Sequence, residues 1–228
     1  MKHLIQSLKN GKAELVDLPC PQAGPGELVI KSNCSLISPG TERMLVDFGK
    51  ANIFNKVRQQ PEKVKTVLNK VKVDGLKTTL EAVNNKLNQP ISLGYSNVGE
   101  IIDIGDGVKG FSIGDRVVSN GSHSEVVKVS RNLCAKIPNS VSDDTASFTV
   151  LASIALQGIR LASPNIGEAY VVIGSGLIGL LTIQILLANG CRVLAIDIDD
   201  SKLKIAQEYG AEICNPNNID DIVEYGMS

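Results

Sequence analysis

Aromatic side chains are scarce in this chain, whose 228 residues include four Phe, four Tyr and no Trp. Proteins that bind nucleic acid stack bases on such rings and interleave them with basic residues, so nucleic-acid binding is not expected. Cysteine is also sparse, with an odd total of five and no C-x-x-C spacing. This argues against a disulfide framework and predicts free thiols in a reducing compartment.

The first residues, MKHLIQSLKNGK, lack the apolar core of a secretory signal, so a cytoplasmic location is expected. One stretch without charge, residues 169–188, is long enough to span a membrane. Its first half is strand-like and is broken by glycines, so no membrane segment is predicted. The 43% of hydrophobic and 21% of charged residues are typical of globular proteins and exclude disorder or a coiled coil as a global description.

The net charge of −1 is unevenly distributed, because residues 50–88 carry nine Lys and Arg against three Asp and Glu. Two apolar sets with helical spacing flank Gly75 in this segment: Val64, Val67, Leu68 and Val71, then Leu76, Leu80, Val83 and Leu87. They predict an inserted helical hairpin over 50–89 with one apolar face. Such a basic hairpin is a solvated surface, a docking face for a C-terminal domain or second subunit, or a cover over a phosphorylated or nucleotide-sugar substrate.

Two β-rich regions flank the insert. Residues 1–48 and 91–138 contain short strand-length runs separated by Gly, Pro, Asp, Ser and Asn, which is the spacing of a small barrel or sandwich. After a helical pattern at 143–161, strand and helix alternate. A buried strand is predicted at 169–174, helices at 177–189 and 200–210, and further strands at 191–198 and 211–214. This alternation predicts parallel pairing with right-handed crossovers.

The strongest chemical signal is the run GSGLIG, which follows the first of these strands and opens a helix. Gly174 permits a tight turn, Gly176 lets the backbone approach a pyrophosphate, and Gly179 allows close packing of helix on strand. Leu177 and Ile178 begin the helix whose N–H groups and dipole point at the phosphates. The run predicts a dinucleotide-binding site.

An acid completes this pattern. Asp197 stands at the end of the next predicted strand, 18 residues after Gly179. A carboxylate there accepts hydrogen bonds from the ribose diol and repels a 2′-phosphate, so NAD is favoured over NADP. Lys202, one turn into the following helix, could reach the same ribose. Two alternatives stay open: the glycines serve packing alone, or the unit binds S-adenosylmethionine through a similar turn and acid.

With these motifs the chain resembles the medium-chain dehydrogenase/reductase family, in which a GroES-like β-barrel domain precedes a Rossmann domain. The glycines and valine of the zinc alcohol dehydrogenase signature stand at Gly94, Gly99, Gly105 and Val108. The runs GVKGFSIGDRVV and NLCAKIP are also similar to this family. The resemblance implies an α/β fold with a β-rich part: a GroES-like domain at 1–150 and an incomplete Rossmann domain at 151–228.

The catalytic zinc ligands of the family are not matched. Their three positions hold Pro39, Tyr95 and a residue at or next to Thr149, and the cysteine-rich lobe for a structural zinc is missing. Zinc needs thiolate, imidazole or carboxylate donors, so no zinc is expected. The two histidines, His3 and His123, are isolated in the sequence and are interpreted as surface or packing residues.

Without a metal, hydrogen bonds must stabilise the charge on a carbonyl oxygen. Thr41 matches the hydroxyl residue that passes protons in the zinc relatives, and the phenol of Tyr95 stands at a former ligand position. Both are candidate catalytic residues, with lining of the pocket as the alternative. The neighbouring Glu42 matches an acid that often has a structural role in the family.

The insert, SPGTERM and GYSNVG together resemble bacterial two-part oxidoreductases, in which a zinc-less half precedes a domain of the glucose–fructose oxidoreductase type. About three of the roughly six strands of a Rossmann domain are predicted here. We therefore expect the N-terminal part of an NAD(P)-dependent, zinc-independent oxidoreductase that transfers hydride to or from a carbonyl or alcohol substrate, sugar-related compounds included. The alternative is a truncated, non-catalytic chain with partial nucleotide affinity or an assembly role.

Overall fold

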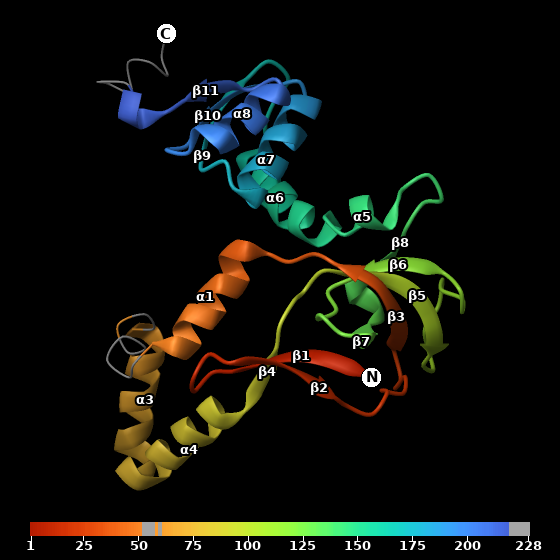
Figure 1. Ribbon diagram of the computed structural model, residues 1–228, viewed down its shortest axis with the longest axis vertical. Coiled ribbons are helices and arrows are strands. Elements are labelled where there is room, and N and C mark those ends of the chain that lie inside the picture. Colours follow the sequence, from red (N-terminus) through yellow and green to blue (C-terminus); the bar gives the residue numbers. More distant parts are fainter. Residues whose placement is uncertain (52–57, 59–60, 219–228) are drawn as a thin grey trace. The chain divides into compact units, whose positions relative to one another are not determined.

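The computed structural model describes residues 1–51, 58 and 61–218. Two compact units divide the chain, Met1–Ser147 and Phe148–Ser228, which we call the first and the second unit (Figure 1). Part of the predicted insert, at 52–57 and 59–60, lies outside the described residues, as does the stretch from 219 to the last residue.

The described strands of the first unit form two antiparallel sheets. The smaller sheet has the order β2-β1-β4, with β1 at Lys2–Ser7, β2 at Ala13–Asp17 and β4 at Pro90–Ser92. The larger has the order β7-β3-β5-β6-β8, with β3 at Glu27–Ser35, β5 at Asn97–Ile104, β6 at Arg116–Ser119, β7 at Val126–Ser130 and β8 at Cys134–Lys136. The short turn η1, Arg131–Leu133, precedes β8. The predicted β-rich regions are confirmed.

One core cluster of the first unit is formed by strands of the larger sheet, where the apolar residues Leu28, Ile30, Ile101, Val117, Val127 and Val129 are buried. Their alternation along the strands follows from the period of two in β structure. Two glycines that match the zinc alcohol dehydrogenase signature, Gly99 and Gly105, leave no room for a side chain. A Cβ on Gly99 would overlap the carbonyl oxygen of Lys31, and one on Gly105 would overlap that of Gly24.

Residues 123–125 join the two sheets. The Leu4 N–H donates to the His123 carbonyl oxygen at 3.0 Å, and the Glu125 N–H donates to that of Lys2 at 3.0 Å. The His123 N–H in turn donates to the Leu93 carbonyl oxygen at 2.8 Å. The backbone around His123 is thereby anchored on both sides.

The helices of the first unit whose bounds are described before β4 are α1 at Pro39–Lys50, α3 at Pro61–Asp74 and α4 at Leu76–Asn88. The predicted hairpin is confirmed in that α3 and α4 contact each other and meet at Gly75, which has a φ of 83°. The predicted apolar stripe is wrong in the first turn of α4, where Leu76 and Leu80 are exposed and Thr79 is buried. Burial of Thr79 is possible because its hydroxyl donates to the Gly75 carbonyl oxygen at 2.9 Å.

The short helix α5, Asp143–Ala146, is tied to the larger sheet through its first carboxylate. The Arg116 Nε donates to Asp143 Oδ1 at 3.1 Å, and the Asn33 amide donates to Oδ2 at 2.8 Å. The guanidinium of Arg116, with the Asn33 hydrogen bond, holds the pKa of the Asp143 carboxyl below its ordinary value.

Asp143→Asn is expected to lower the free energy of unfolding at neutral pH by about 1–2 kcal/mol, the usual value of hydrogen bonds to a charged group at a partly exposed site. Because the folded pKa is depressed, the advantage of the wild type is complete above pH ~4 and is lost as the pH falls through the folded pKa. Urea unfolding of both proteins at neutral and acidic pH measures this difference. An equal difference at all pH values would contradict the assignment.

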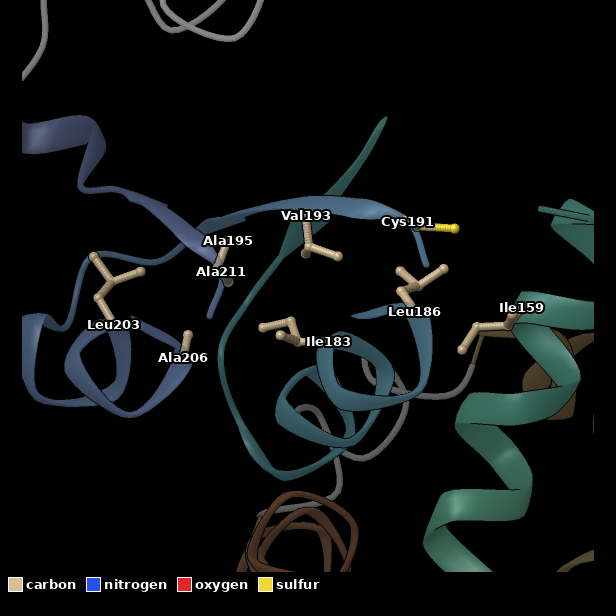
Figure 2. Close-up of a cluster of buried hydrophobic side chains, with 9 residues drawn as sticks. All are labelled: Ile159, Ile183, Leu186, Cys191, Val193, Ala195, Leu203, Ala206 and Ala211. Carbon is tan, nitrogen blue, oxygen red and sulfur yellow. The ribbon is translucent and has the colours of Figure 1, made fainter. Parts of the chain in front are cut away.

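The described part of the second unit is a parallel three-stranded sheet of order β11-β10-β9 with three helices, so the predicted parallel pairing is confirmed. Its elements in chain order are α6 at Thr149–Ala162, β9 at Ala169–Ile173, α7 at Leu177–Ala188, β10 at Arg192–Ile196, α8 at Asp200–Glu208, β11 at Glu212–Cys214 and the short turn η2 at Pro216–Asn218. Figure 2 shows its core, where Val193 of β10 faces Ile183 of α7, and Leu203 and Ala206 of α8 complete the cluster.

Burial of β9 differs from the prediction of a buried strand. Its residues alternate between exposed and half-buried, and Ile173 is 83% exposed. Within the described residues β9 is an edge strand, and one of its faces is uncovered, so its apolar composition does not produce burial.

The stretch 169–188 without charge folds as β9 and α7. Among the described residues, no helix has the length and apolar character needed to cross a membrane. All five cysteines lie in the described part and are free thiols, as predicted.

Candidate functional site

The glycine-rich run of the second unit forms the turn between β9 and α7. Gly174 has a φ of 95°, a conformation that favours glycine, and its N–H donates to the Ile196 carbonyl oxygen at 2.7 Å. Gly176 is the N-cap of α7, which begins at Leu177. The first backbone N–H groups of a helix have no partner inside the helix, so this turn presents N–H donors and the positive end of the helix dipole.

Two glycines of the turn differ in what surrounds them. A Cβ on Gly179 would overlap the carbonyl oxygen of Gly174, so this position is needed for the turn itself. A Cβ on Gly176 would meet no described atom within 4 Å, and the φ of Gly176 is an ordinary −76°. Since nothing in the described fold requires a glycine at 176, the open space beside it suits the close approach of a ligand.

Asp197 follows β10 and lies directly beside this turn. Its Oδ2 accepts the Ser175 N–H at 2.7 Å, and its Oδ1 accepts the Asp199 N–H at 2.9 Å. Burial raises the pKa of the Asp197 carboxyl, but these two N–H donors and the charge of Lys202 outweigh burial and hold the pKa below its ordinary value. The carboxylate is therefore ionised and fixed in orientation, with further lone pairs free to accept hydroxyl groups.

Ser175 carries a polar atom that fits a ligand. Its side chain is fully buried, and its Oγ has no hydrogen-bond partner among the described residues. A buried hydroxyl without a partner costs free energy unless a bound group supplies one. A phosphate oxygen at the N-terminus of α7 would accept this hydroxyl, so the residues present fit a dinucleotide.

For the other residues predicted for this site, the structure gives weaker evidence. Lys202 Nζ lies 3.4 Å from Asp199 Oδ2, one turn along α8, and its reach to a ribose stays a prediction. Leu177 is half-buried and Ile178 is exposed in the first turn of α7. Both contribute backbone N–H groups at the position where the prediction needs them.

The two candidate catalytic hydroxyls come together in the first unit. Thr41 lies in the first turn of α1, and Tyr95 lies in the loop between β4 and β5. The Tyr95 hydroxyl is 3.5 Å from the Thr41 Oγ1, at the long end of the hydrogen-bond range. Thr41 is exposed and Tyr95 half-buried, so both hydroxyls can be reached by a small molecule.

A buried polar cluster beside these hydroxyls was missed by sequence reasoning. His123 Nε2 lies 3.0 Å from Glu42 Oε2, and His123 Nδ1 lies 2.8 Å from Ser35 Oγ. Glu42 Oε1 accepts the Ser38 N–H at 2.8 Å. From the sequence, His123 is interpreted as a surface or packing residue without a partner, because Glu42 is 81 positions away along the chain. In the sequence, Glu42 of the Gly-Thr-Glu triplet was the one residue that could have indicated this cluster.

The donor set for zinc is incomplete. Pro39 and Tyr95 offer no thiolate, imidazole or carboxylate, and neither does Thr149, at or next to which the resemblance places the third ligand. Within residues 1–51, 58 and 61–218, no group of three or more His, Cys, Asp or Glu side chains could hold a metal ion. The residues at the family's ligand positions thus do not fit a zinc ion.

Comparisons of the sequence and of the fold with known proteins both give matches to dehydrogenases. Residues 64–144 match the family model of the alcohol dehydrogenase GroES-like domain. The (R,R)-butanediol dehydrogenase of Bacillus subtilis is 28% identical in an alignment 162 residues long that covers 59% of this chain and 47% of that protein. Among solved structures, a short chain alcohol dehydrogenase from Escherichia coli CFT073 in complex with NADH has a TM-score of 0.75 at 20% identity, covering 99% of this chain and 65% of that one.

The quinone oxidoreductase of Escherichia coli in complex with NADPH has a TM-score of 0.73 at 17% identity, covering 99% of this chain and 61% of that one. The antiparallel sheets and the parallel sheet with its glycine turn define the fold that this chain shares with these oxidoreductases. In sequence over part of its length, and in fold, the chain is similar to these alcohol dehydrogenases and related oxidoreductases. It spans about half the length of the curated relatives it matches.

Proposed function

We propose that this chain acts in NAD(P)-dependent oxidoreduction, with hydride transfer to or from a carbonyl or alcohol carbon. The observation that carries the proposal is the glycine turn at α7 with the ionised Asp197 held against it by the Ser175 N–H at 2.7 Å. Structural neighbours solved with NADH and with NADPH support a dinucleotide. We favour NAD, because a fixed carboxylate repels the 2′-phosphate of NADP.

When bound, the dinucleotide supplies or accepts the hydride. The chain holds it through the N–H groups of α7 and the buried Ser175 hydroxyl at the pyrophosphate, and through Asp197 at the ribose diol. The hydroxyls of Thr41 and Tyr95 donate hydrogen bonds to a substrate oxygen and stabilise the charge that develops there. These roles remain proposals for both hydroxyls.

We propose that the reaction is zinc-independent. Support comes from the chemistry of the residues at the ligand positions, since Pro39, Tyr95 and Thr149 carry no zinc donors. The Glu42–His123 pair is engaged internally, as its contacts of 3.0 Å and 2.8 Å leave neither ring nitrogen free.

The test is calorimetric titration of the purified chain with NADH and then NADPH. We expect tighter binding of NADH, and a loss of that preference in Asp197→Ala, with an affinity for NADH at least about tenfold weaker, since a hydrogen bond to a charged group is worth about 1.5–3 kcal/mol. Glu208→Ala removes an exposed acid on α8 of the same unit and serves as the matched control.

Equal binding of NADH and NADPH by the wild type would contradict the NAD preference. If a folded chain binds neither, the alternative of a non-catalytic chain is favoured, and direct titration with S-adenosylmethionine tests the other class of nucleotide site. The helical insert is proposed as a docking face for a further domain or subunit of a two-part oxidoreductase, on the basis of its excess of six positive charges over residues 50–88.

A further inference from the structure

His123 sits between the two segments that carry the candidate hydroxyls. Glu42, which His123 contacts at 3.0 Å, immediately follows Thr41 on α1. On the other side its ring lies against Gly94, which immediately precedes Tyr95. An ideal Cβ on Gly94 would come within 2.7 Å of three atoms of this ring. His123 thus contacts the residue next to Thr41 and also the residue next to Tyr95.

Each ring nitrogen of His123 has a partner, Ser35 Oγ for Nδ1 and Glu42 Oε2 for Nε2. Carboxylate oxygens only accept, so the proposal requires His123 Nε2 to be the donor to Glu42. Glu42 Oε1 is already committed to the Ser38 N–H at the start of α1, at 2.8 Å. The side chains of His123 and Glu42 are 11% and 10% exposed, so water competes little for this contact. Both oxygens of Glu42 are used, one to cap α1 and one to bind the ring.

The backbone on the Gly94 side of the His123 ring is also held in place. Gly94 has a φ of 85°, and the His123 N–H donates to the carbonyl oxygen of the preceding Leu93 at 2.8 Å. The ring fills the space that a side chain at position 94 would take. The backbone that leads into Tyr95 therefore contacts His123 twice, through the hydrogen bond at Leu93 and through the ring at Gly94.

We propose that His123 is a positioning residue, which holds the hydroxyls of Thr41 and Tyr95 together by binding Glu42 and packing against Gly94. The inference rests on the proposed function in that these hydroxyls are taken to meet the substrate oxygen. It goes further because it gives the contacts of His123 a role: they join two segments of the chain. These segments contain Pro39 and Tyr95, which match the first two ligand positions of the family that the sequence resembles.

The first experiment needs neither substrate nor cofactor, so its outcome is separate from that of the dinucleotide titration. The chain is labelled with 13C at the tyrosine ζ carbon, and the Tyr95 resonance is assigned by its loss in Tyr95→Phe. Thr41→Val calibrates the displacement that follows when the phenol loses its neighbour. We expect His123→Phe, which keeps a ring but no donor, to displace the Tyr95 resonance in the same direction.

Two further variants separate positioning from general stability. His3→Phe changes the other histidine, which contacts Ser92 at 2.8 Å, and should leave the Tyr95 resonance in place. His123→Gln keeps an N–H donor for Glu42 and should restore the wild-type position in part. A folded His123→Phe protein with an unmoved Tyr95 resonance would overturn the proposal, and so would equal displacement by His3→Phe.

A measurement on the wild type keeps the proposal testable if His123→Phe does not fold. Long-range 15N–1H spectra of the two imidazoles report which ring nitrogen carries the proton. We expect His123 Nε2 to be protonated, and Glu42→Gln to change the ring pattern because its amide can donate to that nitrogen. A neutral ring protonated on Nδ1 alone in the wild type could not donate to Glu42 and would refute the assignment.

Discussion

Gly179→Ala is expected to destabilise the second unit by on the order of 3 kcal/mol, because its methyl group has no room. An ideal Cβ at this position overlaps the carbonyl oxygen of Gly174. That oxygen belongs to the turn itself, whose Gly174 N–H is bound to Ile196 of β10 at 2.7 Å. Relief would require α7 to move away from β9, which would open the core that contains Ile183.

Thermal or urea unfolding followed by circular dichroism measures this loss. Gly158→Ala is the matched control, because Gly158 lies inside α6 of the same unit and its Cβ would meet no described atom within 4 Å. Alanine in a helix interior should stabilise that variant by up to about 1 kcal/mol. If Gly179→Ala unfolds at the same urea concentration as the wild type, the close contact of α7 with the turn is wrong.

Gly176→Ala, unlike Gly179→Ala, should leave the protein folded and weaken the binding of NADH at least about tenfold. The reason is that a glycine at position 176 lets the backbone approach the pyrophosphate. The φ of Gly176 is −76°, and its Cβ would meet nothing described within 4 Å. The fold has no need of glycine here. A methyl group would occupy the space in which the phosphates approach the N–H groups of α7.

Calorimetry with NADH, combined with an unfolding curve of the same variant, checks this second expectation. Gly158→Ala again serves as the control, now for binding, because it lies on a different helix of the unit. An unchanged affinity in Gly176→Ala would count against a pyrophosphate at this turn, even if NADH binds elsewhere. Lost affinity together with lost stability would instead assign the glycine to folding.

Much of the fold could be predicted because its signals are local. The period of two in the strands, the helical spacing around Gly75 and the alternation after residue 169 all depend on near neighbours in the chain. The glycine turn and Asp197 belong to the same class of signal, because a strand, a turn and the next strand lie within one short stretch. Their spacing alone was enough to predict where the structure places Asp197.

Other features depend on residues far apart in the sequence. His123 stands alone in the sequence and is interpreted there as a surface or packing residue. The structure pairs it with Glu42, 81 positions away, since sheet pairing brings the two segments together. The exposure of β9 and of Leu76 also follows from what packs on each face, which composition does not specify. Local patterns thus predicted the strands, the helices and the glycine turn. The long-range packing of the first unit alone brings Thr41, Tyr95 and His123 together, because a hydrogen bond between distant residues leaves no local periodicity to detect.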